Sequence, residues 1–327
     1  MALDLFLLLV GLVLLAAGGE TVVRGATGLA RSLGVSPLMI GLTVVAFGTS
    51  APELAVNVIA ATRDQGGISF GNIMGSNMAN IGLIVGCTAI VKPILIHGVV
   101  IAREIPMMLL ATTATVIMGF DTVLGDGNDH YTRGDGLVLL MFFLVFLYYT
   151  VGDFVAQRAD GDSNGAGMAE GARSNGTRRY LIISAVGLAA LVAGADVTVN
   201  AAVHVAREMG VPEVVIGLTV LAIGTSLPEL VASVSATMRG HAELAIGNVV
   251  GSNIFNLLLV LGVTSVIRPI PLQPGGHLDL LVVAVLSLIL FLVSMTNDRK
   301  IVRTEAGLLL AIYVGYIAWR SSNALLS

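Results

Sequence analysis

The chain has 327 residues, of which 56% are hydrophobic and only 12% are charged, whereas a soluble domain carries roughly 25% charged residues. This composition excludes an ordinary soluble protein and predicts an integral membrane protein. The net charge of −4 gives no reason to expect a nucleic-acid partner, and the single cysteine, Cys87, excludes an intrachain disulfide.

Ten apolar segments are long enough to cross a bilayer, whose hydrocarbon core of about 30 Å needs roughly 20 residues per helix. In chain order they are 3–28, 37–61, 68–91, 98–120, 136–155, 179–204, 212–237, 243–266, 277–295 and 302–319. The first segment lacks the positively charged start of a signal peptide and carries Asp4, so we expect it to be retained as a span. The sequence therefore predicts an all-α membrane protein with about ten transmembrane helices.

A polar segment rich in Gly, Ser and Asn divides these spans into two groups of five. It covers 158–178 and is typical of a linker, so we expect a first five-helix repeat in 1–157 and a second in 179–327. Because five is odd, the second repeat enters the membrane from the opposite side. The two halves then form an inverted repeat, which in transporters places the site near the midplane where the halves meet.

The basic residues predict the orientation, because Lys and Arg are enriched in cytoplasmic loops. With the N-terminus outside, 12 of the 17 Lys and Arg residues lie on the cytoplasmic side. We therefore expect both termini outside a cytoplasmic (inner) membrane and the 158–178 loop in the cytoplasm.

On the first span, Glu20 and Arg24 are one helical turn apart and are expected to pair. Their counterparts in the second half are Asp196 and Asn200.

Two motifs occur twice, and every matched position is offset by 176 residues. GTSAPEL at 48–54 returns as GTSLPEL at 224–230, and GNIMGSN at 71–77 returns as GNVVGSN at 247–253. Each copy of the first motif places one carboxylate, Glu53 or Glu229, inside a span, where charge is expensive. A duplicated carboxylate beside a helix break predicts ion transport between the two halves.

The first motif predicts a break in the second and seventh spans. Its proline cannot donate a backbone hydrogen bond and its glycine permits unusual backbone angles, so carbonyls near Ala46 and Thr49 should lose their helical partners. Calcium takes roughly 6–8 oxygen ligands. Bidentate Glu53 and Glu229, with the carbonyls of Thr49 and Thr225, would supply about six of them.

The second motif supplies further oxygen ligands. Ser76 and Asn80 are one turn apart and share a helix face, and Ser252 and Asn256 repeat this spacing. Their hydroxyl and amide groups can bind a cation without adding charge. Neither copy contains His or Cys, which argues against zinc or copper.

Together these motifs resemble the two alpha-repeats of the calcium/cation antiporter superfamily, and most closely its prokaryotic sodium/calcium exchanger branch. The resemblance implies two inverted five-helix repeats with the ion sites among spans 2, 3, 7 and 8. It also implies that Ca²⁺ is exchanged for Na⁺ at overlapping sites by alternating access, with no resident cofactor. Because one chain contains a complete site, we expect a functional monomer in the lipid bilayer.

Carried onto this sequence, the resemblance implies a set of ion ligands. Several relatives have an acidic residue at the position of Asn80 or Asn256, and the amides found here argue against potassium co-transport. The implied calcium ligands are Glu53, Glu229 and the carbonyls of Thr49 and Thr225. The implied flanking sodium sites use the carbonyls of Ala46 and Ala222 with Ser50, Ser76, Ser226 and Ser252, while Asn80 and Asn256 flank the centre.

The nearest alternative is an exchanger of protons for Ca²⁺ or another divalent cation on the same scaffold, because a buried glutamate can release its cation by taking up a proton. The hydroxyls beside both glutamates favour sodium. A channel usually places symmetric subunits around a pore, and a membrane scaffold without transport would leave the duplicated carboxylates unexplained. No nucleophile–base pair and no phosphate-binding glycine loop indicates an enzyme.

Overall fold

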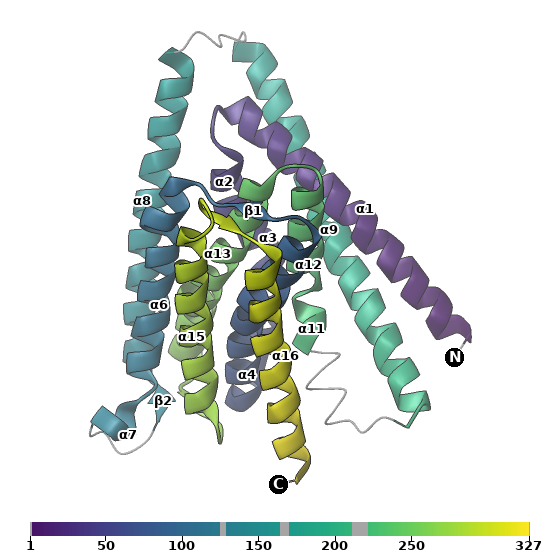
Figure 1. Cartoon of the computed structure of the whole chain (residues 1–327), viewed down its shortest axis with the longest axis vertical. Coiled ribbons are helices and arrows are strands. Elements are labelled where there is room, and N and C mark those ends of the chain that lie inside the picture. Colours follow the sequence, from purple (N-terminus) through teal and green to yellow (C-terminus); the bar gives the residue numbers. More distant parts are fainter. Residues whose placement is uncertain (1, 125–128, 164–169, 211–221, 327) are drawn as a thin grey trace.

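A computed structural model describes residues 2–124, 129–163, 170–210 and 222–326. They form a bundle of long helices with two short strand pairs (Figure 1). In the first half the elements are α1 (Ala2–Leu33), α2 (Pro37–Ile40), η1 (Gly41–Val45), α3 (Ala46–Thr62), α4 (Gly66–Met78), η2 (Ala79–Val85), α5 (Gly86–Val91), β1 (Ile94–Leu95), η3 (Val100–Glu104), α6 (Ile105–Met118), α7 (Asp121–Leu124), β2 (His130–Tyr131) and α8 (Arg133–Ser163).

The second half has the same general plan, and the segments marked η are π-helical in both halves. Its described elements are α9 (Glu170–Glu208), α11 (Ala222–Thr225), α12 (Leu227–Met238), α13 (Ala242–Ile254), η5 (Phe255–Val260), α14 (Leu261–Ile267), β3 (Ile270–Pro271), α15 (Gly276–Met295), β4 (Lys300–Ile301) and α16 (Arg303–Leu326).

Eight continuous helical stretches in the described part of the chain are long and apolar enough to span a membrane. They correspond to eight of the ten predicted spans. The predicted seventh span begins within 211–221, outside the described residues, and the predicted tenth is the 24-residue helix α16. The predicted linker at 158–178 is partly helical, because α8 continues to Ser163 and α9 begins at Glu170.

The longest helices, α1 and α9, lie side by side at the edge of the bundle (Figure 1). Gly11, Gly18 and Gly25 recur every seven residues on α1 and face α9. A Cβ on Gly18 would lie 2.8 Å from the backbone nitrogen of Leu191. Small residues permit such close helix contact in lipid, where packing takes the place of the hydrophobic effect. The pair is therefore held by backbone proximity along one glycine face.

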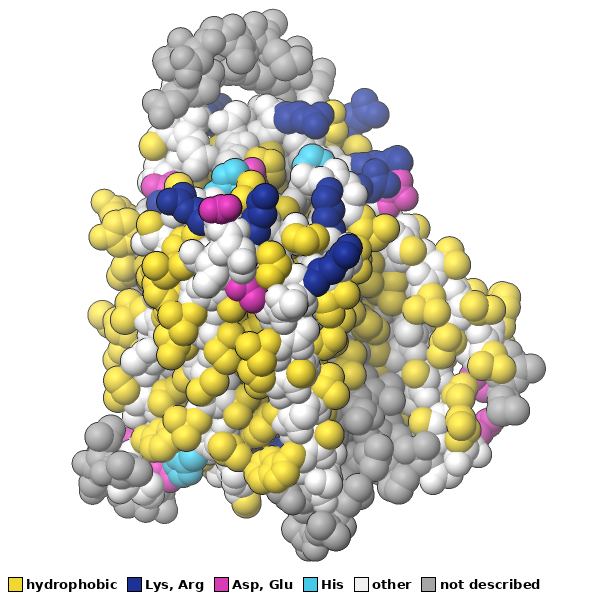
Figure 2. Space-filling model, viewed as in Figure 1, with side chains coloured by type: hydrophobic (Ala, Val, Ile, Leu, Met, Phe, Trp, Pro, Cys, Tyr) yellow, Lys and Arg dark blue, Asp and Glu magenta, His cyan; other side chains and the backbone are white. Residues whose placement is uncertain are grey.

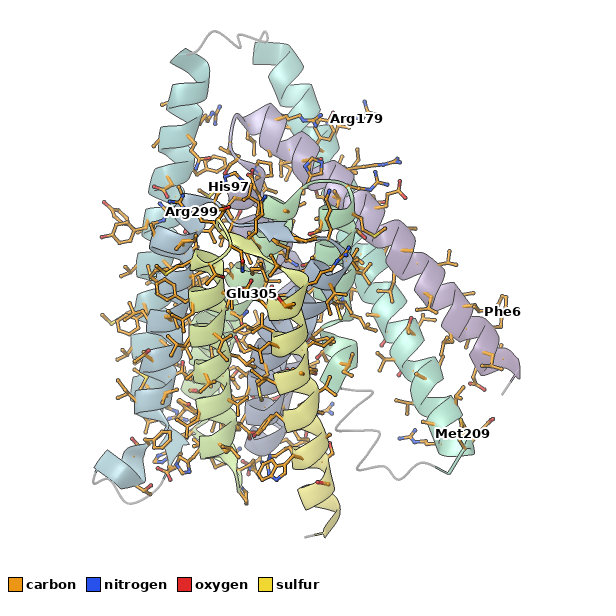
Figure 3. The ribbon with its side chains drawn as sticks, in the orientation of Figure 1. Phe6, His97, Arg179, Met209, Arg299 and Glu305 are labelled. Atoms are coloured by element: carbon orange, nitrogen blue, oxygen red, sulfur yellow. The ribbon has the colours of Figure 1, made fainter. Side chains whose placement is uncertain are left out.

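Two antiparallel strand pairs join the halves at opposite ends of the bundle (Figure 1). β1 pairs with β4, with Ile94 opposite Ile301, and β2 pairs with β3, with Tyr131 opposite Ile270. Figure 3 shows His97, Arg299 and Glu305 gathered at the end of the bundle where β1 and β4 lie. Each pair links a strand of one repeat to a strand of the other, so the halves are held together at both ends.

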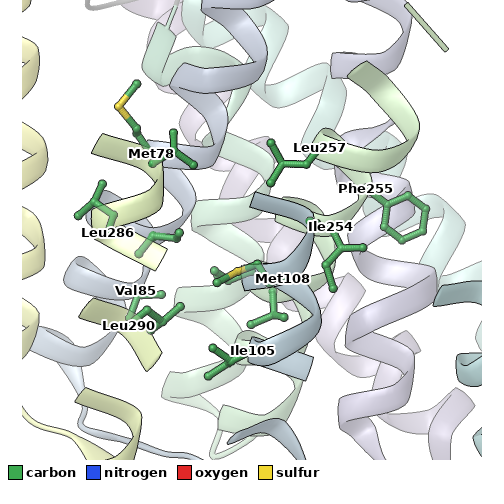
Figure 4. Close-up of a cluster of buried hydrophobic side chains, with 14 of the residues drawn as sticks. Met78, Val85, Ile105, Met108, Ile254, Phe255, Leu257, Leu286 and Leu290 are labelled. Atoms are coloured by element: carbon green, nitrogen blue, oxygen red, sulfur yellow. The ribbon is translucent and has the colours of Figure 1, made fainter. Parts of the chain in front are cut away.

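The largest cluster of buried apolar residues lies between the two second-motif helices and their neighbours α6 and α15. Figure 4 shows part of it, drawn from α4, η2, α6, α13, η5 and α15. Met78, Met108, Leu257 and Leu290 are each at most 3% exposed. This packing fixes the helices that carry the second motif.

The outer surface has the distribution expected of a membrane protein. Figure 2 shows hydrophobic side chains over the middle of the molecule and a concentration of Lys and Arg above them. Leu144, Val285 and Leu308 are among the large apolar side chains that remain about half exposed or more. An apolar surface of this extent is costly in water and is matched by a bilayer.

Replacing Gly18 with leucine should separate α1 from α9, because its side chain would enter the space occupied by the backbone of α9. Overpacking of this kind typically costs about 1–3 kcal/mol, so we expect the thermal midpoint of the detergent-solubilised protein to fall. Ala16→Leu is the matched control, since Ala16 is exposed on the same helix. Equal midpoints for the two variants would contradict the close contact.

Candidate ion-binding site

The two glutamates of the repeated motif lie on α3 and α12, near the centre of the bundle. Glu53 and Glu229 are each 1% exposed. The Ser50 hydroxyl, one turn before Glu53, donates to Glu229 Oε1 at 3.3 Å. Because Ser50 and Glu229 come from different halves, this hydrogen bond brings the two copies of the motif together, as the sequence predicts.

The two copies interrupt their helices in different ways. In the first, the chain stays helical through Pro52, and the irregularity is the π-helical segment η1 immediately before α3. In the second, Ser226 forms a turn between α11 and α12, and Pro228 lies in the first turn of α12. Proline fits the first turn of a helix because its missing N–H has no partner to lose there. The predicted break is thus present as a turn at Ser226 in the second half, whereas in the first half the helix continues through the motif and only the segment before it, η1, is π-helical.

The second motif shows closer symmetry. η2 begins at Ala79 and η5 at Phe255, which are 176 residues apart. Asn80 and Asn256 occupy the second position of these π-helical segments and are each 1% exposed. Short π-helical segments interrupt the α-helical hydrogen-bond ladder and recur at functional sites. η2 packs against α12 and η5 against α3, so each half places a buried amide on a segment that contacts the carboxylate-bearing helix of the other half.

Many oxygen atoms of the predicted site lack a hydrogen-bond partner among the described residues. They include both carboxylate oxygens of Glu53 and one of Glu229. Buried polar atoms are nearly always paired in folded proteins. The remaining unpartnered site groups are the hydroxyls of Ser76, Ser226 and Ser252 and the side-chain amides of Asn80 and Asn256. Buried oxygens that lack protein partners are suited to binding cations.

The electrostatics support the same reading. Within the described part of the chain, neither glutamate forms a salt bridge with Lys, Arg or His. Burying a carboxylate without a counter-charge costs several kcal/mol. The same residues contain no cluster of three or more His, Cys, Asp or Glu side chains. The available ligands are hard oxygens, which suit Ca²⁺ and other hard cations.

The remaining predicted ligands differ in how deeply they are buried and in how much of their surroundings the structure describes. Ala46 is fully buried at the start of α3, and the Thr49 hydroxyl donates toward the carbonyls of Val45 and Ala46 at 3.1 and 3.4 Å. Thr225 is half-buried at the end of α11. Ala222 begins α11 directly after 211–221, which lies outside the described residues.

A network of amides supports the carboxylate-bearing helices, and the sequence reasoning missed it. In the first half, Asn57 Nδ2 donates to the Glu53 carbonyl at 2.7 Å and to Asn72 Oδ1 at 2.8 Å. The Ser69 hydroxyl donates to Asn57 Oδ1 at 2.8 Å. Asn57 is fully buried. These hydrogen bonds fix the turn of α3 that carries Glu53 against α4.

Asn248, the counterpart of Asn72, connects three helices. Its Nδ2 donates to the Ser233 hydroxyl at 3.0 Å and weakly to the Glu229 carbonyl at 3.5 Å. Its Oδ1 accepts from the Thr49 hydroxyl of the other half at 3.3 Å. The signal was present in the sequence, because the asparagine of the GN pair occurs in both copies of the second motif.

Comparison with known proteins agrees with this geometry. The family described as "Sodium/calcium exchanger protein" matches residues 3–152 and 179–321. The putative antiporter CaxA of Alkalimonas amylolytica is 38% identical over 94% of this chain and 95% of its own length. The inner membrane protein YrbG of Escherichia coli is 34% identical over 98% of this chain and 96% of its own length.

Solved structures agree with the sequence comparison. A structure of the sodium-calcium exchanger NCX_Mj has a TM-score of 0.82 and 33% identity to this chain, covering 97% of this chain and 98% of its own. The helical bundle, the presence of one buried carboxylate of the repeated motif in each half and the extent of these matches lead to one conclusion. The chain belongs to the sodium/calcium exchanger protein family and is a cation antiporter of the membrane.

Proposed function

We propose that this protein exchanges Ca²⁺ for Na⁺ across the membrane by alternating access, with both ions competing for the site around Glu53 and Glu229. The observation that carries the proposal is the pair of buried carboxylates without a cationic side chain among the described residues. Sodium as the coupling ion is supported by the family match and by the unpartnered hydroxyls beside the carboxylates.

In this proposal the calcium ion is bound by both carboxylates and by the carbonyls of Thr49 and Thr225. Sodium ions use the same carboxylates and two flanking positions. One is formed by the Ala46 carbonyl with Ser76 and Ser50, and its counterpart by the Ala222 carbonyl with Ser252 and Ser226. Asn80 and Asn256 line the centre without adding charge, so we expect no dependence on potassium.

Antiport follows from the electrostatics of the site. Two ionised carboxylates in a low-dielectric interior repel each other unless a cation lies between them. A transporter with an ion-free site therefore resists the change of facing, in which the site closes to one side of the membrane and opens to the other. A transporter whose site holds Ca²⁺ or Na⁺ does not resist it. We propose that the change of facing moves α1 and α9 past the site. The two helices are held together by close contacts between small residues, so they can move past the site as one unit.

We further propose that both termini lie outside and that the segment around 158–178 lies in the cytoplasm. The excess of Lys and Arg at one end of the molecule (Figure 2) supports this orientation. The name of the inner membrane relative supports a cytoplasmic membrane location. Because one chain carries both motif copies, the monomer is proposed as the functional unit.

The direct test is ⁴⁵Ca²⁺ uptake into proteoliposomes loaded with NaCl and diluted into sodium-free buffer. We expect uptake driven by the outward sodium gradient and no comparable uptake into choline-loaded vesicles. Uptake driven only by a proton gradient would contradict sodium coupling and favour the proton/calcium alternative, to which the unpaired buried carboxylates are also suited. Uptake with neither gradient would contradict antiport and indicate a channel.

Glu53→Gln and Glu229→Gln should each lower sodium-driven calcium uptake by at least about tenfold, since a lost charge interaction of roughly 1.4 kcal/mol already has that effect. Both variants should remain folded, because each removes a buried charge. Glu243→Gln is the matched control: Glu243 lies in the first turn of α13 and pairs with His97. Normal uptake by either site variant would overturn the assignment.

Asn248→Ala should raise the KM for calcium about fivefold with a smaller change in kcat. The substitution frees Thr49 and the Glu229 turn from one shared partner, and a hydrogen bond is worth about 1 kcal/mol. Asn253→Ala, on the same helix, is the control, since Asn253 Nδ2 donates to the Val249 carbonyl of its own helix. Equal KM values for the two variants would show that Asn248 does not position the ligands.

A further inference from the structure

An ion pair fastens α1 to the helix that carries Glu229. Glu20 Oε1 accepts from Arg239 at 2.5 Å and from Arg24 at 2.5 Å. Arg239 is the C-cap of α12. Next to Glu20, a Cβ on Gly19 would lie 2.8 Å from Ser235 Oγ, so α1 rests directly on α12 here. The predicted Glu20–Arg24 pair is thus confirmed, and Arg239 extends it across the two halves.

The internal repeat places a second acid–arginine pair at matching positions. Adding 176 to Glu20 gives Asp196 on α9, and subtracting 176 from Arg239 gives Arg63. Arg63 is the C-cap of α3, as Arg239 is of α12. Both arginines therefore end the helix that carries a site glutamate. Glu20 lies on α1 and Asp196 on α9, which are the two long outer helices.

The second pair is not formed in this structure. Among the described residues, Asp196 and Arg63 have neither a hydrogen bond nor an ion pair through their side chains, and both are exposed. α9 also touches α3 over a shorter stretch than that over which α1 packs on α12. An exposed carboxylate within a membrane-spanning helix is costly and usually has a partner. In this conformation Asp196 therefore lacks the partner that the internal repeat predicts for it.

We propose that Glu20–Arg239 and Asp196–Arg63 are alternative ion pairs, one for each facing of the transporter. The inference rests on the proposed antiport function. When two inverted repeats exchange conformations, the site closes to one side of the membrane and opens to the other. In this protein, the contact of α1 with α12 is then replaced by the contact of α9 with α3. Because α1 and α9 are interlocked through glycines, their movement breaks one pair as it forms the other. Each pair then stabilises one end state.

Cysteine pairs test this directly in a Cys87→Ser background. One variant carries Glu20→Cys with Arg239→Cys, another Asp196→Cys with Arg63→Cys, and a third carries all four. A bifunctional methanethiosulfonate reagent that spans the length of a Glu–Arg pair is applied to proteoliposomes in sodium and in calcium, and crosslinks are read by mass. We expect each pair to crosslink, and no molecule of the third variant to hold both crosslinks.

Absence of the 63–196 crosslink in both ions, or a molecule that holds both crosslinks, would overturn the proposal. The crosslinks are detected by mass and do not depend on transport. A failure of sodium/calcium exchange in the parent protein is therefore detected separately, by measuring its calcium flux.

Charge reversal gives a second readout. Arg63→Glu should slow uptake about fivefold, the upper range for an exposed pair, and adding Asp196→Arg should restore it. No restoration would also count against the pair.

Discussion

The structure depends on two carboxylates that are buried without a cationic side chain in the described part of the chain. Glu53 and Glu229 are each 1% exposed, and the protein supplies one long hydrogen bond from Ser50 to a carboxylate oxygen. Desolvation of such charges costs several kcal/mol per ion. A Lys or Arg partner would remove this cost permanently and with it the affinity for a mobile ion. Under the proposed function, the transported cation is the counter-charge of these unpartnered oxygens.

Around this site, the amide network fixes the backbone while leaving the carboxylates free. Asn57 and Asn248 donate to the carbonyls of Glu53 and Glu229, not to their side chains. The two halves are not equivalent, since Asn57 and Ser69 have Ser233 and Ala245 as counterparts. The two carboxylate-bearing helices are therefore held by different hydrogen bonds in the two halves.

The outer helices pack in a different way from the inner helices. The second-motif helices are locked by the large apolar cluster that Figure 4 shows. α1 and α9 instead meet through glycines and present apolar side chains to the lipid. Such close contact between small residues keeps the two helices together as one unit.

The sequence by itself determined the membrane class and the inverted repeat, and it singled out the two glutamates that the structure buries. Composition, an odd number of spans and a 176-residue offset are all visible in one dimension. It did not reveal that Pro52 lies inside a continuous helix while Ser226 forms a turn. It also missed the contacts of Asn57 and Asn248, and the pairing of Glu20 with Arg239. Only the tertiary structure decided these, because each depends on which of two similar halves a neighbouring helix packs against.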